Sequence, residues 1–238
     1  MVLSVLAYNI HFGQKLKLIQ DWIINYESQF DIVCLQEFPL EKNSRFLKIF
    51  EANSYSYAFA PSFLRRGKQY GELTLFKNTK IKMLDNDVIK LGTNILERRS
   101  YKNNGENSSL LTLLQYQNKK FILANSHLFC FAFNSHRIGQ LTKILDRIKD
   151  VAKDHSTPTI ILGDFNYTSI IRQKRLMDFM RSHKLLNAYK AHTHRLFFLK
   201  QQLDYVFYGN CKISNIAIGK KIKYSDHYPV KVDITFKD

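Results

Sequence analysis

Short apolar segments that end in acidic, amide or imidazole side chains recur along the whole chain. The segments Val2–Ile10, Asp31–Glu37 and Thr159–Leu162 have the length and the β-branched content of strands. Each ends on or beside a polar group, and such a group is costly to bury unless it is paired or bound to a metal. The pattern therefore predicts buried strands whose polar ends gather at a common site.

Amphipathic helices and further strands fill most of the remaining chain. Apolar residues at helical spacing predict helices over Lys15–Tyr26, Arg45–Asn53, Ser135–Lys153 and Ser169–His183. Composition predicts further strands over Tyr55–Ala60, Leu73–Phe76, Ile81–Leu84, Leu110–Tyr116, Lys120–His127, Leu203–Tyr208, Ile213–Ile218 and Tyr228–Phe236. This mixture suits an α/β fold, a four-layer α/β sandwich in which two packed mixed β-sheets are flanked by helices. No break in the pattern separates two units, so we expect a single domain over residues 1–238.

The charge balance points to polyanionic partners. Lys and Arg number 36 against 20 Asp and Glu, which gives a formal net charge of +16. A basic surface raises the local concentration of polyanions and speeds their encounter with the protein. Nucleic acid, anionic phospholipid headgroups and inositol phosphates all qualify, and a plain solvated basic surface is an equally good explanation of the charge alone.

Cysteine content and hydropathy exclude several classes of protein. The cysteines Cys34, Cys130 and Cys211 lack a metal-binding spacing, and their odd number argues against a disulfide framework. No apolar run reaches the roughly 18 residues that a transmembrane helix needs. The apolar N-terminus lacks the basic region of a signal peptide, so we interpret it as the first strand. A cytoplasmic location is the default expectation, and secretion by a route that reads no N-terminal signal stays open.

The candidate chemical groups are the oxygen and nitrogen donors at the ends of the predicted strands. They are Asn9, Glu37, His127, Asp164, Asn166, Asp204, Asp226 and His227. Each alone has a plain explanation, such as a turn cap or a hydrogen-bonded core histidine, but their recurrence at successive strand ends is harder to explain in that way. Oxygen ligands without cysteine suit Mg²⁺ or Mn²⁺, and histidines beside carboxylates suit acid–base catalysis near neutral pH. The sequence has neither a glycine-rich phosphate loop nor a G-x-S-x-G nucleophile motif.

A set of short motifs occurs in one order across nearly the whole chain. They are A-Y-N-I-H at Ala7–His11, D-I-V-C-L-Q-E at Asp31–Glu37, Y-G-E-L-T-L-F at Tyr70–Phe76, N-S-H-L at Asn125–Leu128, G-D-F-N at Gly163–Asn166, L-D-Y-V-F at Leu203–Phe207 and S-D-H-Y-P-V at Ser225–Val230. In this order they resemble the endonuclease/exonuclease/phosphatase superfamily, which includes deoxyribonucleases, apurinic-site endonucleases, inositol polyphosphate phosphatases and bacterial sphingomyelinases. The resemblance implies a monomeric, deoxyribonuclease-like hydrolase of phosphate esters that depends on a divalent metal.

The resemblance also implies which residues hold the metal and the phosphate. Glu37 is expected to be the principal ligand of Mg²⁺ or Mn²⁺, with Asn9 beside it and Asp226 as a further carboxylate on the metal side. Asp164 is expected to position the nucleophile, and Asn166 is expected to bond the phosphate through its amide.

Two histidines carry the proton chemistry that the resemblance implies. His227 is expected to activate the attacking water or to stabilise the phosphorane, while Asp204 holds its ring. His127 is expected to contact the phosphate and to protonate the leaving group, and Glu72 is expected to be its carboxylate partner. A metal and cationic donors would together offset the charge that gathers on a five-coordinate phosphorus.

Four arginines are candidate substrate contacts. Arg137 opens the long helix after His127, where family members place an arginine that faces the phosphate; an exposed helical arginine is equally consistent with the sequence. Arg65, Arg66 and Arg98 lie in basic stretches that are expected to be loops. Such loops either grip a phosphate backbone or are simply solvated.

Two other features have open interpretations. The apolar run Phe129–Phe133 after His127 is expected to be plain core, with a lipid-contacting lip as the less favoured explanation. His192 and His194 have the spacing of a zinc-like pair on one face of a strand, but the sequence offers no third ligand nearby.

The charge makes nucleic acid the first-choice substrate, so a nuclease (phosphodiesterase) is the leading functional hypothesis. The alternative is a sphingomyelinase-like phosphodiesterase or a phosphatase that acts on phosphoinositide or phospholipid headgroups. A catalytically silent binding module on the same fold is a third hypothesis, and the complete set of polar motif residues argues against it.

Overall fold

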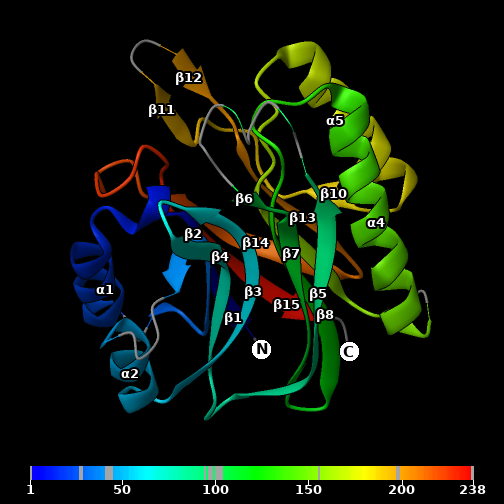
Figure 1. The fold of residues 1–238 in the computed structure, drawn as a ribbon. Helices are drawn as coiled ribbons and strands as arrows, with labels where there is room; N and C mark the ends of the chain where they lie inside the picture. The colour runs from blue at the N-terminus through cyan, green and yellow to red at the C-terminus, as the bar shows by residue number, and fades with distance from the viewer. Residues whose placement is uncertain are drawn as a thin grey trace.

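The computed structural model describes residues 2–26, 29–40, 45–93, 95, 99, 104–154, 156–196 and 199–236. In this part of the chain two β-sheets pack face to face and α-helices cover their outer faces (Figure 1). The four layers confirm the α/β sandwich with two mixed sheets that the sequence predicts.

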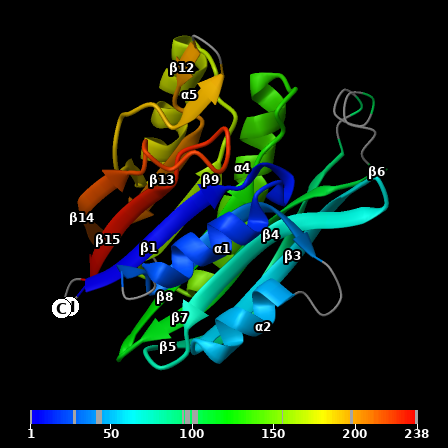
Figure 2. The same cartoon turned by 90° about the vertical axis from the view of Figure 1, so that its left-hand side faces the viewer.

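The first sheet is built from both ends of the chain. Its strands are β1 (Val2–Asn9), β2 (Ile32–Leu40), β3 (Tyr55–Arg65), β4 (Lys68–Lys77), β6 (Asn104–Gly105), β14 (Cys211–Ile218) and β15 (Val230–Phe236). They lie in the order β14-β15-β1-β2-β4-β3-β6, with β1 parallel to β2 and antiparallel to β15. The helices α1 (Leu16–Asn25) and α2 (Arg45–Ala52) cover its outer face and stand in front of it in Figure 2.

The second sheet comes from the middle and the last third of the chain. Its strands are β5 (Ile81–Gly92), β7 (Asn107–Tyr116), β8 (Lys119–His127), β9 (Thr159–Asp164), β10 (Leu186–Asn187) and β13 (Asp204–Gly209). They lie in the order β10-β13-β9-β8-β7-β5, and α4 (Asn134–Ala152) connects the parallel pair β8 and β9. The outer face packs against α4 and α5 (Ile170–Ser182).

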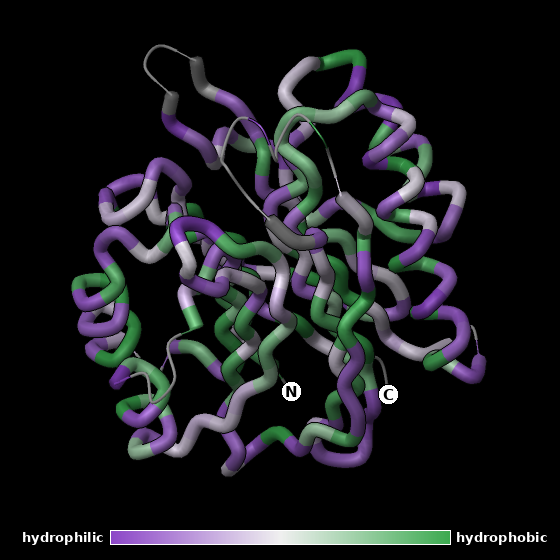
Figure 3. Tube along the Cα trace, in the orientation of Figure 1, coloured by the Kyte–Doolittle hydropathy of each residue, from purple (hydrophilic) through white to green (hydrophobic). Residues whose placement is uncertain are grey.

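The core lies between the sheets and beneath the helices. Val5 of β1 and Leu123 of β8 belong to one buried cluster that joins the inner faces of the two sheets. Ile23 of α1 and Leu141 of α4 anchor their helices on the outer faces. Figure 3 shows green and purple segments alternating along α4 and α5, as expected of helices that bury one face.

Several strands extend beyond their predicted ends. β3 continues past Ala60 through the bulge at Pro61 and Phe63, and β4 begins at Lys68 rather than at Leu73. β5 runs on to Gly92 although its middle is polar, because β5 is the edge strand of its sheet and leaves those side chains in solvent. The short strand β6 and the start of β7 follow it in the first and second sheets.

The burial of the cysteines differs from one to the next. Cys34 and Cys211 are buried and Cys130 is half-buried. None of the described helices combines the length and the apolar character that a membrane crossing requires.

Strand direction brings the predicted polar strand ends to one edge of the sandwich. Asn9 at the end of β1 lies opposite Gln36 in the parallel neighbour β2, one residue before Glu37. His127 at the end of β8 lies opposite Asp164 at the end of β9. Asp204 pairs with Asp164 from the antiparallel strand β13. The carboxyl ends of the parallel strands of both sheets therefore meet at this edge.

Candidate active site

Asp164 is the centre of the polar cluster at the strand ends. Its Oδ2 accepts a hydrogen bond from Asn9 Nδ2 at 3.0 Å and lies 3.7 Å from His127 Nε2 and 3.6 Å from His227 Nε2. Asn9 Nδ2 also donates to Glu37 Oε1 at 3.3 Å, and this oxygen is 3.8 Å from His127 Nε2. The structure thus brings two buried carboxylates and two imidazoles around one point.

The carboxylate of Asp204 fixes the ring of His227. His227 Nδ1 lies 2.8 Å from Asp204 Oδ2, and this contact leaves His227 Nε2 directed toward Asp164. The Thr193 hydroxyl accepts hydrogen bonds from the backbone N–H groups of Leu203 and Asp204 at 3.1 and 3.0 Å and so holds the start of β13 in place. The geometry matches the histidine–aspartate pair expected from the sequence.

Neighbouring charges set the ionisation of the cluster. Burial lowers the pKa of His227, but the carboxylates of Asp204 and Asp164 outweigh that effect and raise the pKa to about 10. Burial raises the pKa of Asp164, with the histidines opposing the shift and neighbouring carboxylates adding to it. At neutral pH His227 is therefore an imidazolium that can donate from Nε2.

The backbone is strained where it presents the site. Glu37 has φ of 59° within the bulge of β2, and its carboxylate Oε2 accepts a hydrogen bond from the backbone N–H of Phe12 at 2.9 Å. Phe12 itself has φ of 55° in the 3-10 turn η1 (His11–Gly13). Such left-handed conformations cost free energy in residues with side chains and are concentrated at functional sites.

Gly163 is required by the close approach of β8 and β9. Its φ is +127°, and a Cβ atom at this position would lie 2.0 Å from the carbonyl oxygen of Ser126. Only glycine fits there, and the next residue is Asp164. The glycine of the G-D-F-N motif thus lets the two parallel strands place their polar ends side by side.

Asn166 closes the same motif beneath the cleft. It has φ of 56°, a conformation that asparagine tolerates well, and its backbone N–H donates to Asp164 Oδ1 at 2.9 Å. Its side-chain Nδ2 donates to the carbonyl of Leu128 at 3.0 Å, and the residue lines the cleft.

Glu72 occupies a fully buried position on β4. Its Oε2 accepts hydrogen bonds from the hydroxyls of Ser62 at 2.6 Å and Ser108 at 3.0 Å, while Oε1 has no hydrogen-bond partner among the described residues. Burial raises the pKa of Glu72 to about 7, against the lowering effects of both serines and of His127. His127 acts on Glu72 electrostatically, and the expected pairing of these two residues stays a prediction.

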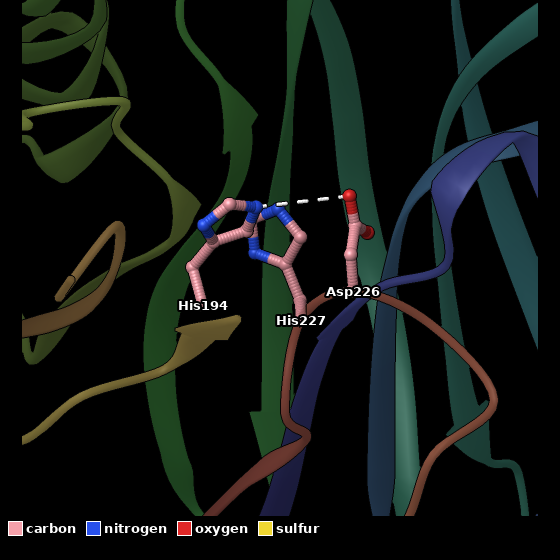
Figure 4. A group of neighbouring side chains, drawn as sticks. All are labelled: His194, Asp226 and His227. Carbon is pink, nitrogen blue, oxygen red and sulfur yellow. Dashed lines mark ion pairs between the residues drawn. The ribbon is translucent and has the colours of Figure 1, made fainter. Parts of the chain in front are cut away.

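Asp226 lies among three histidines, His11, His194 and its neighbour His227. Its Oδ2 is 2.8 Å from His11 Nδ1. The same oxygen is 3.7 Å from His194 Nε2 (Figure 4). Burial raises the pKa of Asp226, but the hydrogen bond from His11 and the nearby rings of His194 and His227 outweigh that effect and hold the pKa below its usual range. Sequence reasoning missed His11 as a member of the site, although His11 closes the A-Y-N-I-H motif. It considered His194 only as half of a zinc-like pair with His192, whereas the structure places His194 beside Asp226 and His227.

A cleft of about 710 Å³ opens above these groups. Arg65 lines it with its guanidinium carbon 3.7 Å from the centre of the Phe12 ring. Arg66 is exposed in the tight turn between β3 and β4 and is absent from the cleft wall, so the predicted basic loop is a hairpin turn in which only Arg65 faces the site. Arg98 lies outside the described residues.

Arg137 supports the cleft from below. It is 1% exposed, and its Nε and Nη2 donate to the carbonyls of Phe129 and Cys130 at 2.8 and 2.5 Å. The sequence alternative of an exposed helical arginine is therefore wrong. Its guanidinium also packs 5.4 Å from the ring centre of Tyr167, and the residue still borders the cleft.

The apolar run after His127 is divided between core and surface. Phe129 is buried, whereas Phe131 and Phe133 are 44% and 69% exposed at the rim of the cleft. The prediction of plain core is correct for Phe129 and wrong for Phe131 and Phe133. Residues 128–133 form a loop that is neither strand nor helix and that runs along the edge of the cleft. Phe131 and Phe133 are exposed because this loop buries only part of the apolar run.

Sequence comparison identifies the family. The Endonuclease/Exonuclease/phosphatase family matches residues 6–227. The chain belongs to this family. The matched range contains all the polar strand ends that converge at the site, from Asn9 to His227.

Individual similar proteins are distant in sequence, and the similar solved structures share the fold. The UPF0294 protein plu0699 of Photorhabdus laumondii is 30% identical over 127 residues, which is 53% of this chain and 47% of that protein. The alignment thus covers about half of this curated relative. The human nocturnin catalytic domain, solved with bound sulfate, superimposes with a TM-score of 0.79 at 19% identity, over 99% of this chain and 95% of that one. ANGEL2, a 2',3'-cyclic phosphatase, gives a TM-score of 0.78 at 16% identity, over 98% and 95%.

The donor set of this family member fits a hard divalent cation. Glu37 and Asp164 are buried carboxylates whose oxygens flank the same nitrogen of His127, and Asn9 holds both through its amide. Burial raises the pKa of Asp164, as expected of an acid that lacks full compensation of its charge. Carboxylate oxygens without thiolates are the ligands that Mg²⁺ and Mn²⁺ prefer.

Proposed function

We propose that this chain hydrolyses phosphodiester bonds of nucleic acid with the help of Mg²⁺ or Mn²⁺. The observation that carries the proposal is the position of Asp164, whose Oδ2 lies within 3.7 Å of both His127 and His227. A phosphate in the cleft would have a carboxylate on one side of its phosphorus and imidazoles at its oxygens. In-line attack needs this placement of a proton acceptor and cationic donors.

Each residue has a role that follows from its protonation. Asp164, with its raised pKa, orients the attacking water and accepts its proton. His227 is an imidazolium held by Asp204, so it donates from Nε2 to a phosphoryl oxygen as charge develops there. His127 contacts the phosphate from the other side and gives a proton to the leaving oxygen. Of the two roles considered for His227, stabilisation of the phosphorane is the one favoured.

Glu37 would hold the cation beside Asp164. Asn9 positions both carboxylates, because its amide nitrogen donates to each and its Oδ1 accepts from the backbone of His11 at 3.0 Å. When bound, a divalent cation supplies positive charge that offsets the charge building on the phosphate oxygens. We therefore assign Glu37 the ligand role and Asn9 a positioning role, while Asp226 acts through its histidines.

Charge and aromatic side chains support nucleic acid as the substrate. The net charge is +16, and Arg65 stacks on Phe12 at one wall of the cleft. Phe131 and Phe133 stand exposed at another wall. Aromatic side chains beside a basic groove stack unpaired bases without sequence preference, so single-stranded segments are the favoured form.

A second substrate class is supported by the apolar rim. Phe131 and Phe133 are exposed, and so are Ile170 and Ile171 at the start of α5, at 85% and 70%. Exposed apolar groups beside a cleft in a basic protein also suit an anionic phospholipid surface. A lipid-headgroup phosphodiesterase or phosphatase is therefore the second candidate.

A hydrolysis panel tests the proposal. Single-stranded RNA, single-stranded DNA, supercoiled plasmid, a phosphoinositide and sphingomyelin are incubated with Mg²⁺ or Mn²⁺, with chelator, and with the His227→Ala variant. We expect polynucleotide cleavage that chelator and the variant both abolish. Release of a lipid headgroup with intact polynucleotide would move the assignment to the second candidate. Binding without hydrolysis of any substrate would indicate a silent binding module and contradict the proposal.

A further inference from the structure

We propose that His194, Asp226 and His227 form a second metal site, specific for a transition-metal cation such as Zn²⁺, and that its occupation inhibits the enzyme. One ligand atom from each residue lies within 4.8 Å of the other two (Figure 4). The group combines two imidazoles with one carboxylate. It is therefore chemically different from the oxygen-rich position beside Glu37 and Asp164.

The third ligand comes from a hairpin that the fold fastens against the active site. The strands β11 (His194–Leu196) and β12 (Leu199–Gln201) form this hairpin, which projects beside the polar strand ends in Figure 1. His194 forms a β-bridge with His227, and the backbone N–H of Arg195 donates to the carbonyl of Asp226 at 2.8 Å. The backbone N–H of Tyr228 donates to the carbonyl of Thr193 at 2.6 Å. These contacts hold the ligands in register without any ion.

Two of the three ligands are oriented by a further polar group. Nδ1 of His227 is hydrogen-bonded to Asp204, which directs Nε2 into the cleft. The ion would bind this nitrogen by displacing its proton to solvent, as metal binding to histidine requires the neutral ring. Asp226 Oδ2 accepts a hydrogen bond from His11, which fixes the carboxylate. A carboxylate–histidine–metal arrangement of this kind is typical of zinc sites.

The spacing is compatible with an ion after a small adjustment. His194 Nε2 lies 3.7 Å from Asp226 Oδ2, and the rings of His194 and His227 are 4.6 Å apart between centres. Tetrahedral zinc with bonds of about 2.0–2.1 Å separates its ligands by roughly 3.4 Å. Side-chain movements of about 1 Å would bring the three ligand atoms to this separation. The fourth ligand position of the ion would face the cleft.

The donor types decide which cation each site selects. Imidazole suits zinc, copper and nickel, whereas Mg²⁺ prefers oxygen ligands and retains its waters. A millimolar excess of Mg²⁺ should therefore leave the histidine site open to micromolar Zn²⁺. The consequence for activity rests on the proposed function, because Nε2 of His227 would bind the ion instead of the phosphate.

Cobalt provides a readout that does not depend on activity. Co²⁺ is titrated into the intact protein in excess Mg²⁺, and the visible absorption of low-coordinate cobalt is followed. His194→Ala is compared with His192→Ala, since His192 is exposed and lies two residues before it. We expect wild type and His192→Ala to bind one equivalent that Zn²⁺ displaces, and His194→Ala to bind at least about tenfold more weakly.

Equal Co²⁺ affinity in wild type and His194→Ala would overturn the site, as would the lack of cobalt absorption in wild type up to about 1 mM. His194→Asn, compared by circular dichroism, serves in place of His194→Ala if the alanine variant unfolds. Inhibition is then measured as the zinc concentration that halves the activity of each protein. This half-inhibitory concentration should be at least about tenfold higher for His194→Ala than for wild type. Cobalt binding without zinc inhibition would refute the inhibitory role alone, and a protein inactive on every substrate would still give the cobalt result.

Discussion

The carboxylates in and near the cleft differ in protonation according to their individual neighbours. Asp226 is kept ionised by His11 and His194, whereas burial raises the pKa of Asp164 and that of Glu72, the latter to about 7. Environments that push the pKa values of acidic groups apart divide the work of acid and base between them. At the residue scale the site is therefore a set of unequal acids arranged around two histidines.

Glu72→Gln should make the protein more stable at alkaline pH while reducing its activity. The pKa of Glu72 rises from 4.5 to about 7 on folding, so between these values the folded state holds more protons than the unfolded state. The free energy of unfolding therefore falls as pH rises through about 7, by at most about 3 kcal/mol. Glutamine stays neutral and can still accept from Ser62 and Ser108. Urea unfolding at pH 5 and pH 8 measures the difference.

The matched control for this change is Glu51→Gln on α2, an exposed position. The stability gap between Glu72→Gln and wild type should widen by about 1–3 kcal/mol from pH 5 to pH 8, whereas Glu51→Gln should follow wild type. A gap that is constant with pH would show that Glu72 does not take up a proton on folding.

At the scale of elements, the site depends on how closely β8 and β9 approach. Gly163→Ala would place a methyl group 2.0 Å from the carbonyl of Ser126 and would force a left-handed φ of +127° on alanine. We expect a loss of at least about 2 kcal/mol in the free energy of unfolding, together with loss of activity, because Asp164 is the next residue. Thermal unfolding and turnover of one substrate measure both effects.

Gly139→Ala is the control for this substitution. Gly139 is exposed on α4, and a Cβ atom there meets nothing within 4 Å. Alanine should stabilise the protein by about 0.5–1 kcal/mol without changing turnover, because glycine is a poor helix former. Equal effects of the two substitutions would refute the steric explanation of Gly163.

The elements also show what could be predicted from sequence. Asn9, Glu37, Asp164 and the other motif residues were predictable, because apolar runs that end in polar groups indicate parallel strands with their ends at one edge. The contact of His194 with Asp226 and His227 was not, since its strand has three residues and these partners lie about 30 positions later. The spacing of residues along the chain does not predict a contact between such distant positions. The exposure of Phe131 and Phe133 could not be predicted either, because an apolar run has the same hydropathy whether it is buried or exposed.

For the whole molecule, the charge of +16 should govern substrate binding. The affinity for single-stranded DNA, measured with an inactive His227→Ala protein, should fall steeply with salt because bound phosphates release counterions. Three or more phosphate contacts would give a log–log slope of about −2 or steeper. Fluorescence anisotropy between 50 and 300 mM salt, roughly the range in which this effect is large, measures it.

Arg65→Ala should make that slope shallower by about 0.7, whereas Arg181→Ala on the exposed side of α5 should change it little. A slope near zero in the parent protein would argue against a polymer backbone and in favour of a small headgroup.

His227, held by the carboxylate of Asp204, is proposed to act at the phosphate in this cleft. Asp204→Asn removes the negative charge from this pair, and turnover of a chromogenic phosphodiester in Mg²⁺ or Mn²⁺ measures the effect. Asp178→Asn, an exposed change on α5, is the control. We expect kcat of Asp204→Asn to fall about 10²–10⁴-fold with little change in KM, while Asp178→Asn keeps the wild-type rate. A folded Asp204→Asn protein with wild-type kcat would refute the role of the His227–Asp204 pair.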